Sequence, residues 1–140
     1  EILIGIEVEY QKALWSVLNT NKVTLGLTGV YDFAPQAADG GDTAPFPYAT
    51  MGQIFAVQMD TQTTEGFEMT GRVHVFSRSG SMLQCKTIQG KIYDLLHRST
   101  LTVTGFNNFL LLRNDSDCLM DEDGKVHGVC EYRGLVDSSA

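Results

Sequence analysis

The chain has 140 residues, of which 43% are hydrophobic and 19% are charged, and this is the composition of a folded globular domain rather than of a disordered segment. The formal net charge is −7, from 10 basic and 17 acidic residues. This balance argues against a surface that grips duplex DNA or an anionic membrane, because both kinds of binding depend on clustered Lys and Arg. The length suits one domain, which we expect to span residues 1–140.

The cysteines and the hydropathy pattern exclude further classes. No stretch is apolar for long enough to span a bilayer, and no signal peptide is visible. The chain has an odd number of cysteines without a Cys-x-x-Cys pair, which predicts neither a disulfide framework nor a zinc site: Cys85, Cys118 and Cys130. We therefore expect reduced thiols in a reducing compartment, with Cys85 buried on a helix.

The first predicted element is an amphipathic helix over residues 7–19. Its apolar stripe consists of Tyr10, Ala13, Leu14, Val17 and Leu18. Residues 23–29 predict a short irregular link, and residues 30–33 predict a short strand. Residues 34–47 hold all of the prolines and two adjacent glycines, which predicts a long loop or flexible arm. Either this arm is a plain surface excursion or it orders against a partner.

Two strands and a second helix follow. Residues 48–59 predict a long strand with apolar residues on both faces, and residues 67–76 alternate with a period of two, so these strands predict an antiparallel hairpin. Serines after residue 76 can cap the next helix. Its apolar residues recur at spacings of two to four, which puts most of them on one stripe: Leu83, Cys85, Ile88, Ile92, Leu95 and Leu96. We expect Lys86, Gln89, Lys91 and Asp94 on the opposite side.

The C-terminal third predicts a short strand at 109–113, an acidic loop at 115–124 and a last strand at 126–136. In that strand Val129, Glu131, Arg133 and Leu135 should face away from Cys130, Tyr132 and Val136. The fold class expected from this order is α+β. It is a mixed, mostly antiparallel sheet of four to five strands, with two main helices packed on one face.

The sequence contains no recognisable catalytic or metal-binding set. Aligning Gly124 with the invariant glycine of a calcium loop puts Cys130 in place of the bidentate glutamate, so that template fails. The histidines His74, His97 and His127 lack ligand spacing, and phosphate-loop and nucleophile-elbow motifs are missing. We therefore expect no enzyme, no metal and no cofactor. An enzyme that uses Asp and His on the sheet face is a weaker alternative.

Several segments, taken in their order and spacing, carry a resemblance over nearly the whole chain. They are Val8–Trp15, Val30–Gln36, Pro45–Tyr48, Val73–Arg78 and Asp121–Val129. In these segments the chain resembles the tail terminator, or tail completion, proteins of long-tailed bacteriophages and gene transfer agents. The resemblance implies a virion structural protein at the head–tail interface, assembled in the host cytoplasm.

The resemblance also implies partners. It implies a homo-oligomeric ring, commonly a hexamer, that caps the tail tube, ends its polymerisation and docks the head completion or adaptor protein. DNA would pass through its channel without sequence-specific binding. From the chemistry of the arm we expect a subunit or partner interface at Phe33, Pro35, Pro45, Phe46, Tyr48 and Arg78. We expect an acidic loop or channel-facing group at Asp121, Glu122 and Asp123.

Two alternatives to the terminator role remain. One is a head-side adaptor or stopper protein of the same connector. The other is a small, dimeric, ligand-binding α+β regulatory domain, which would form closed dimers rather than rings.

Overall fold

The computed structural model describes residues 5–32, 45–60, 62, 65–78, 81–120 and 124–138, with the backbone alone described at 108–110 and 138. Within these residues the chain forms three helices and five strands. The helices are α1 (Ile6–Thr20), α2 (Lys22–Leu25) and α3 (Leu83–Leu96). The strands are β1 (Val30–Tyr31), β2 (Tyr48–Gln58), β3 (Gly66–Ser77), β4 (Phe106–Met120) and β5 (Val126–Ser138).

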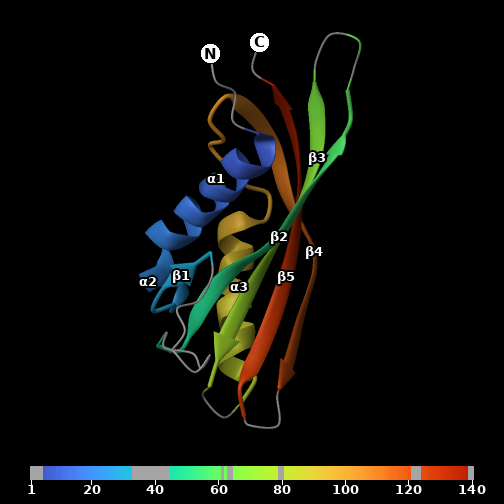
Figure 1. Cartoon of the computed structure of the whole chain (residues 1–140). Helices are drawn as coiled ribbons and strands as arrows, with labels where there is room; N and C mark the ends of the chain where they lie inside the picture. Colours follow the sequence, from blue (N-terminus) through green and yellow to red (C-terminus); the bar gives the residue numbers. More distant parts are fainter. Residues whose placement is uncertain are drawn as a thin grey trace, which may run out of the picture.

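The strands form a single sheet in the order β1-β2-β3-β5-β4. The short β1 runs parallel to β2, and every other neighbouring pair is antiparallel. Figure 1 shows α1 and α3 on the same face of this sheet, and among the described residues no helix lies on the other face. The predicted α+β class, with a mixed and mostly antiparallel sheet and two main helices on one face, is confirmed.

The core lies between the two long helices and the inward side chains of the strands. The alternation predicted for β3 and β5 is confirmed, because their buried and less buried residues take turns along each strand. The largest side chains that are almost completely buried come from α1, α3 and the four long strands: Tyr10, Leu14, Leu18, Tyr48, Met69, Val73, Val75, Ile92, Leu96, Leu111, Val126 and Tyr132.

The prediction for α3 was wrong for Gln89, and Leu83 is an apolar residue that lies off the buried stripe. Leu83 is 72% exposed, because it precedes Cys85 by two residues and therefore lies about 200° from it around the helix. Gln89 is buried, because it follows Cys85 by four residues and shares its face. Its amide donates a hydrogen bond to the backbone oxygen of Asp117 at 2.9 Å, which satisfies a polar group inside the core.

The C-terminal prediction was wrong about the acidic loop. Strand β4 runs through residues 115–120 and pairs with β5 as far as Met120. The Asp115 and Asp117 side chains are exposed on this strand, so their charges stay in contact with water and the strand can accommodate them.

Residues 23–29, predicted as an irregular link, contain part of the short helix α2. At the start of α3, the backbone N–H of Leu83 donates to Ser81 Oγ at 3.3 Å, while the N-cap position itself belongs to Met82.

Gly128 of β5 lies directly under α3. A Cβ at this position would be 2.5 Å from Cys85 Sγ and closer still to Gln89 Nε2. Both of those side chains are buried on the inner face of the helix, so they have little room to move. The absence of a side chain at residue 128 therefore sets how closely α3 approaches the sheet.

We expect Gly128→Ala to lower the free energy of unfolding by about 1–3 kcal/mol, because the added methyl overpacks this contact. Gly90→Ala is the matched control, since Gly90 is exposed on α3 and a methyl added there would meet no atom within 4 Å. That control should be neutral, or stabilising by about 0.5–1 kcal/mol through helix propensity. Urea unfolding of both variants measures the difference, and equal stabilities would contradict the close approach of α3.

Candidate assembly surfaces

Large apolar side chains stand exposed at many positions of this chain. Those on α1, on β2 and directly after β2, with at least 38% of their surface exposed, are Val8, Trp15, Phe55, Val57 and Met59. In the part of the chain that the structure describes, no group of three His, Cys, Asp or Glu side chains could hold a metal ion, and no helix is long and apolar enough to cross a membrane. Exposed apolar side chains that lie side by side in a patch can mark contact with a partner.

The first surface, which we call the β2 surface, consists of Phe55, Val57 and Met59. These side chains are 39%, 54% and 51% exposed, while the neighbouring Ile54 and Ala56 pack against the core. The guanidinium carbon of Arg72 lies 5.9 Å from the centre of the Phe55 ring. The β2 surface therefore lies on the face of the sheet away from the helices.

The backbone of β2 is also open along this stretch. Strand β1 pairs only with Ala49 and Thr50, so among the described residues no strand covers the outer edge of β2 from residue 52 to 58. That segment contains no charged residue and no proline. Natural edge strands are usually protected by charges, prolines or a covering element, so an unprotected edge is available for pairing with another chain.

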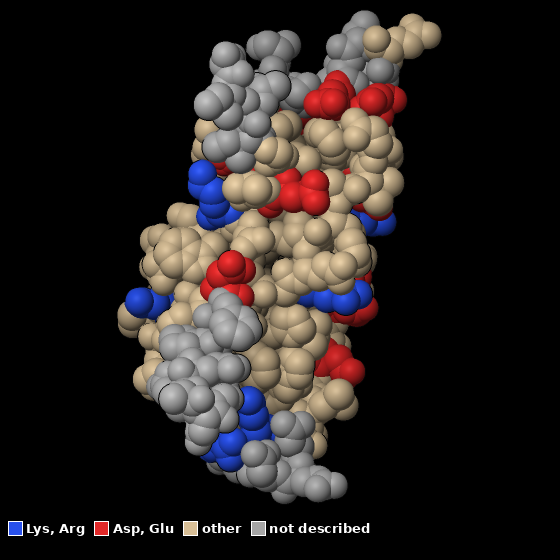
Figure 2. Space-filling model, in the orientation of Figure 1, with Lys and Arg blue, Asp and Glu red and all other residues tan. Residues whose placement is uncertain are grey.

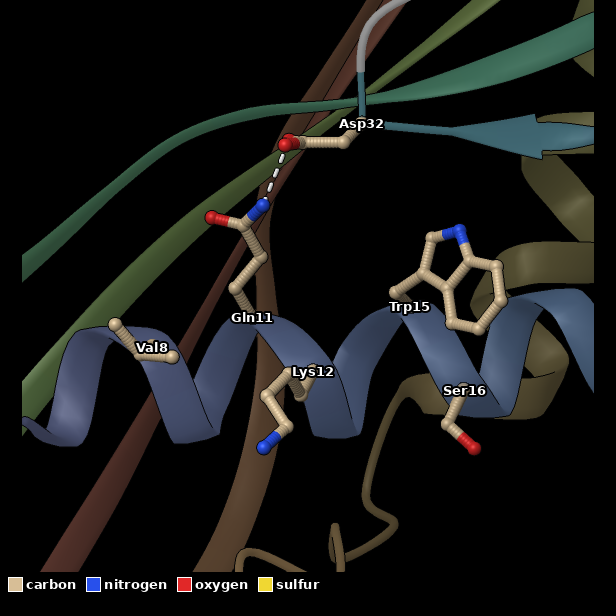
Figure 3. Close-up of a pocket in the computed structure, with 6 residues that line it drawn as sticks. All are labelled: Val8, Gln11, Lys12, Trp15, Ser16 and Asp32. Atoms are coloured by element: carbon tan, nitrogen blue, oxygen red, sulfur yellow. Dashed lines mark hydrogen bonds between the residues drawn. The ribbon is translucent and has the colours of Figure 1, made fainter. Parts of the chain in front are cut away.

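The second surface, which we call the α1 groove, is an open groove of about 530 Å³ on the outer side of α1. Figure 3 shows the six residues that line it: Val8, Gln11, Lys12, Trp15, Ser16 and Asp32. Trp15 Nε1 donates to the backbone oxygen of Val30 at 2.9 Å, and Gln11 Nε2 donates to Asp32 Oδ1 at 2.6 Å. These bonds tie α1 to β1, so the groove is held in shape before anything binds to it.

A column of aromatic and imidazole rings crosses β2, β3 and β5 near the start of β2, away from the β2 surface. Its members, in order, are Phe46, Tyr48, Phe76, His127 and His74, with successive ring centres 5.2, 5.1, 4.5 and 5.0 Å apart. Two cations contact this column: the Arg78 guanidinium lies 5.3 Å from the Phe46 ring, and Lys125 Nζ lies 4.9 Å from the Phe76 ring.

The structure brings some of the expected interface residues together in this column. Phe46 is half-buried, Arg78 is exposed and Tyr48 is only 1% exposed, so the Tyr48 side chain already packs within one chain. Pro45 is exposed, and its backbone oxygen accepts a hydrogen bond from Thr28 Oγ1 at 2.6 Å. The other expected site residues lie outside the described residues: Phe33, Pro35, Asp121, Glu122 and Asp123. The arm predicted at 34–47 is described from Pro45 onward.

The pairing of His74 with His127 is a feature that sequence reasoning missed. The two residues are 53 positions apart, and the β3–β5 register brings His74 Nδ1 to 2.8 Å from His127 Nε2. The alternation of β3 and β5 puts both on the same face, but only the strand register shows that they meet. Burial lowers the pKa of His74 below its ordinary value, and the nearby His127 and Arg72 lower it further.

The fold and the exposed apolar surfaces define a protein suited to assembly, and comparison with known proteins agrees. The family model described as tail completion protein gp17 matches residues 12–137, so the chain belongs to that family. A search of curated proteins gave no match. The family membership confirms the resemblance found in the sequence, and it makes this a tail completion protein with a structural role in a virion, not an enzyme.

A solved structure has a similar fold. It is described as the virion of a native gene transfer agent (GTA) particle, and one of its chains matches with a TM-score of 0.80 and 17% sequence identity. The match covers 97% of this chain and 100% of that chain. At this level of identity the comparison supports the fold, whereas the family membership carries the structural role.

We expect the free energy of unfolding to depend on pH through His74. Because the folded-state pKa is lowered, the unfolded chain binds the proton more readily, so this contribution is complete above about pH 6.5 and is lost as the pH falls from there toward the lowered pKa. His74→Gln, which cannot take up the proton, should show a smaller loss of stability between about pH 7.5 and pH 5.5. Urea unfolding at the two pH values measures it, and identical losses in both proteins would contradict the effect.

Proposed function

We propose that this protein forms a ring, of six copies, at the head–tail interface of the virion. There the ring caps the tail tube, ends its polymerisation and presents a docking surface to the head completion protein. The proposal rests on the family membership together with one structural observation, which is that the chain carries two unlike apolar surfaces. Tail tube protein below the ring and head protein above it are the other proposed partners.

Two unlike surfaces are what a ring requires. A rotationally symmetric ring of more than two copies is built from heterologous contacts, in which one surface of each subunit meets a different surface of the next. The β2 surface is on the face of the sheet without helices, and the α1 groove is on the outer side of a helix that covers the opposite face. The two surfaces therefore cannot meet within one chain but can meet between neighbours.

In this proposal the β2 surface of one subunit packs into the α1 groove of the next, and both surfaces expose apolar side chains. The β2 surface presents apolar side chains on the long β2–β3 hairpin, which extends beyond the helices in Figure 1. The α1 groove is concave, and it exposes Val8 and Trp15. Lys12 at the groove is 64% exposed, and the hairpin carries exposed acids at Asp60 and Glu65. Charges at the edge of such a contact set its orientation and its rate of formation.

The acidic balance suits a channel for DNA. On the face drawn in Figure 2, the described Lys and Arg side chains lie singly or in small groups over a largely uncharged surface, without a basic stripe. With a net charge of −7, a lumen of this protein would repel phosphate and let DNA slide without sticking. We propose that Asp121, Glu122 and Asp123 face this channel.

The arm supplies a further contact in this proposal. In this proposal the arm, together with Tyr48 at the start of β2 and Arg78 directly after β3, contacts a neighbouring subunit or a head protein. The residues expected in the contact from the arm and its start are Phe33, Pro35, Pro45 and Phe46. The packed Tyr48 and Phe46 rings would anchor the arm to the sheet, while the exposed Pro45 and Arg78 would reach the partner.

We expect Val57→Glu to weaken the association of subunits at least about 100-fold, because an unpaired charge buried in an apolar contact costs about 3 kcal/mol or more. Val57 is 54% exposed in the single chain, so the variant should fold normally. Leu83→Glu is the matched control, since Leu83 is 72% exposed and lies outside both surfaces. Native mass spectrometry of the three proteins measures ring formation. Rings of Val57→Glu at wild-type concentrations, or closed dimers in the wild type, would contradict the proposal.

Electron microscopy of particles made without this protein tests its place in the virion. A tail terminator that ends polymerisation should leave overlong or headless tails when it is missing. Filled heads that leak DNA would instead identify a head-side adaptor or stopper, and normal particles would exclude both roles.

A further inference from the structure

Three elements that are distant in the sequence bring all of the cysteines into one region. Cys85 comes from α3, Cys118 from β4 and Cys130 from β5. Cys118 Sγ lies 3.2 Å from Cys85 Sγ and 3.0 Å from Gln89 Oε1, although the two cysteines are 33 residues apart. This separation of the sulfurs is about 1.2 Å longer than a disulfide bond of about 2.0 Å. A small shift of α3 against β4 would therefore bring them within bonding distance.

We propose that Cys85 and Cys118 are a modification site, at which an intramolecular disulfide joins α3 to β4 when the protein passes from a reducing to an oxidising environment. The virion role supplies that passage, because a particle assembled in a reducing cytoplasm is released into oxidising surroundings. The bond itself does not depend on the ring proposed above. It requires only the folded chain and a disulfide reagent.

The surroundings make Cys118 the sulfur that reacts first. It is half-buried, and it lines an open groove of about 340 Å³ between α3 and β4. Lys86, Arg113 and Asp117 line the same groove, so its charged side chains carry a net positive charge that attracts a small anionic disulfide such as glutathione disulfide. Cys85 and Cys130 are buried, and burial raises the pKa of both thiols, to about 12 for Cys130, so neither competes as an initial nucleophile.

The reaction is two successive thiol–disulfide exchanges. The Cys118 thiolate attacks one sulfur of glutathione disulfide, which forms a mixed disulfide and releases one glutathione thiolate. The Cys85 sulfur then attacks Cys118 Sγ, and the proton of the Cys85 thiol passes to the departing sulfur, so that the second glutathione leaves as a thiol. Two protein thiols are oxidised and one glutathione disulfide is reduced to two thiols, so no other reactant is required.

The disulfide would fix α3 at the point where it rests on the sheet. Cys85 also contacts the position of Gly128, where a Cβ would clash with it. The bond would close a loop that contains most of α3 and most of β4, and closing a loop of this length restricts the unfolded chain. The expected consequence is a particle component that resists unfolding after release more strongly than during assembly.

The test is to treat the purified full chain with glutathione disulfide at about pH 8 and then count free thiols under denaturing conditions. We expect the count to fall from three to one, the mass to fall by two hydrogen atoms, and non-reducing peptide mapping to link Cys85 with Cys118. The oxidised protein should also unfold at a higher urea concentration than the reduced protein.

Two variants separate this outcome from others. Cys130→Ala should still form the bond and should lose both of its remaining thiols, whereas Cys118→Ala should keep two thiols and gain no stability from the treatment. Three persistent thiols in the wild type, a stable glutathione adduct on Cys118, or a bond that includes Cys130 would each overturn the proposal.

Discussion

Side chains alternate between the two faces of a strand, so burying one row of β2, β3 and β5 against α1 and α3 leaves the other row without helical cover in the described part of the chain. That second row contains both polar and apolar side chains. It holds the exposed Phe55 and Val57, the ion pair of Arg72 with Glu131 at 3.0 Å and the stacked rings around Phe76. A single chain gains little by exposing such a row, but an assembling chain can bury it against a neighbour.

The one-sided cover also determines which parts of the sheet are supported by contacts within the chain. On the covered face, α3 approaches β5 closely because Gly128 has no side chain, and Gln89 and the cysteines fill the space between helix and strands. On the same face, Trp15 and Gln11 bind α1 to β1 and Asp32, so the α1 groove belongs to the same helical layer. The β2 edge beyond Thr50 has no such support from the described part of its own chain. This contrast fits a stiff body whose hairpin contacts a neighbour.

Much of this fold was predictable from the sequence, because periodicity reports which face of an element is buried. The helix at 7–19, the strands at 48–59 and 67–76, and the opposite orientation of Val129 and Cys130 all followed from such patterns. The strand character of residues 115–120 could not be predicted, since carboxylates on an exposed strand face look like a loop. The His74–His127 contact, the cysteine cluster and the α1 groove all depend on strand register and helix placement, which one sequence does not specify.

The central claim is that the uncovered row and the open edge of β2 exist to contact another copy of the chain. Amide hydrogen exchange compared between the isolated subunit and the assembled ring tests it most directly, because exchange reports whether a backbone N–H is paired or open. The expected result is slower exchange at residues 52–58 on assembly, with residues of the buried face of α3 unchanged. Equal exchange at 52–58 in the two states would contradict the claim.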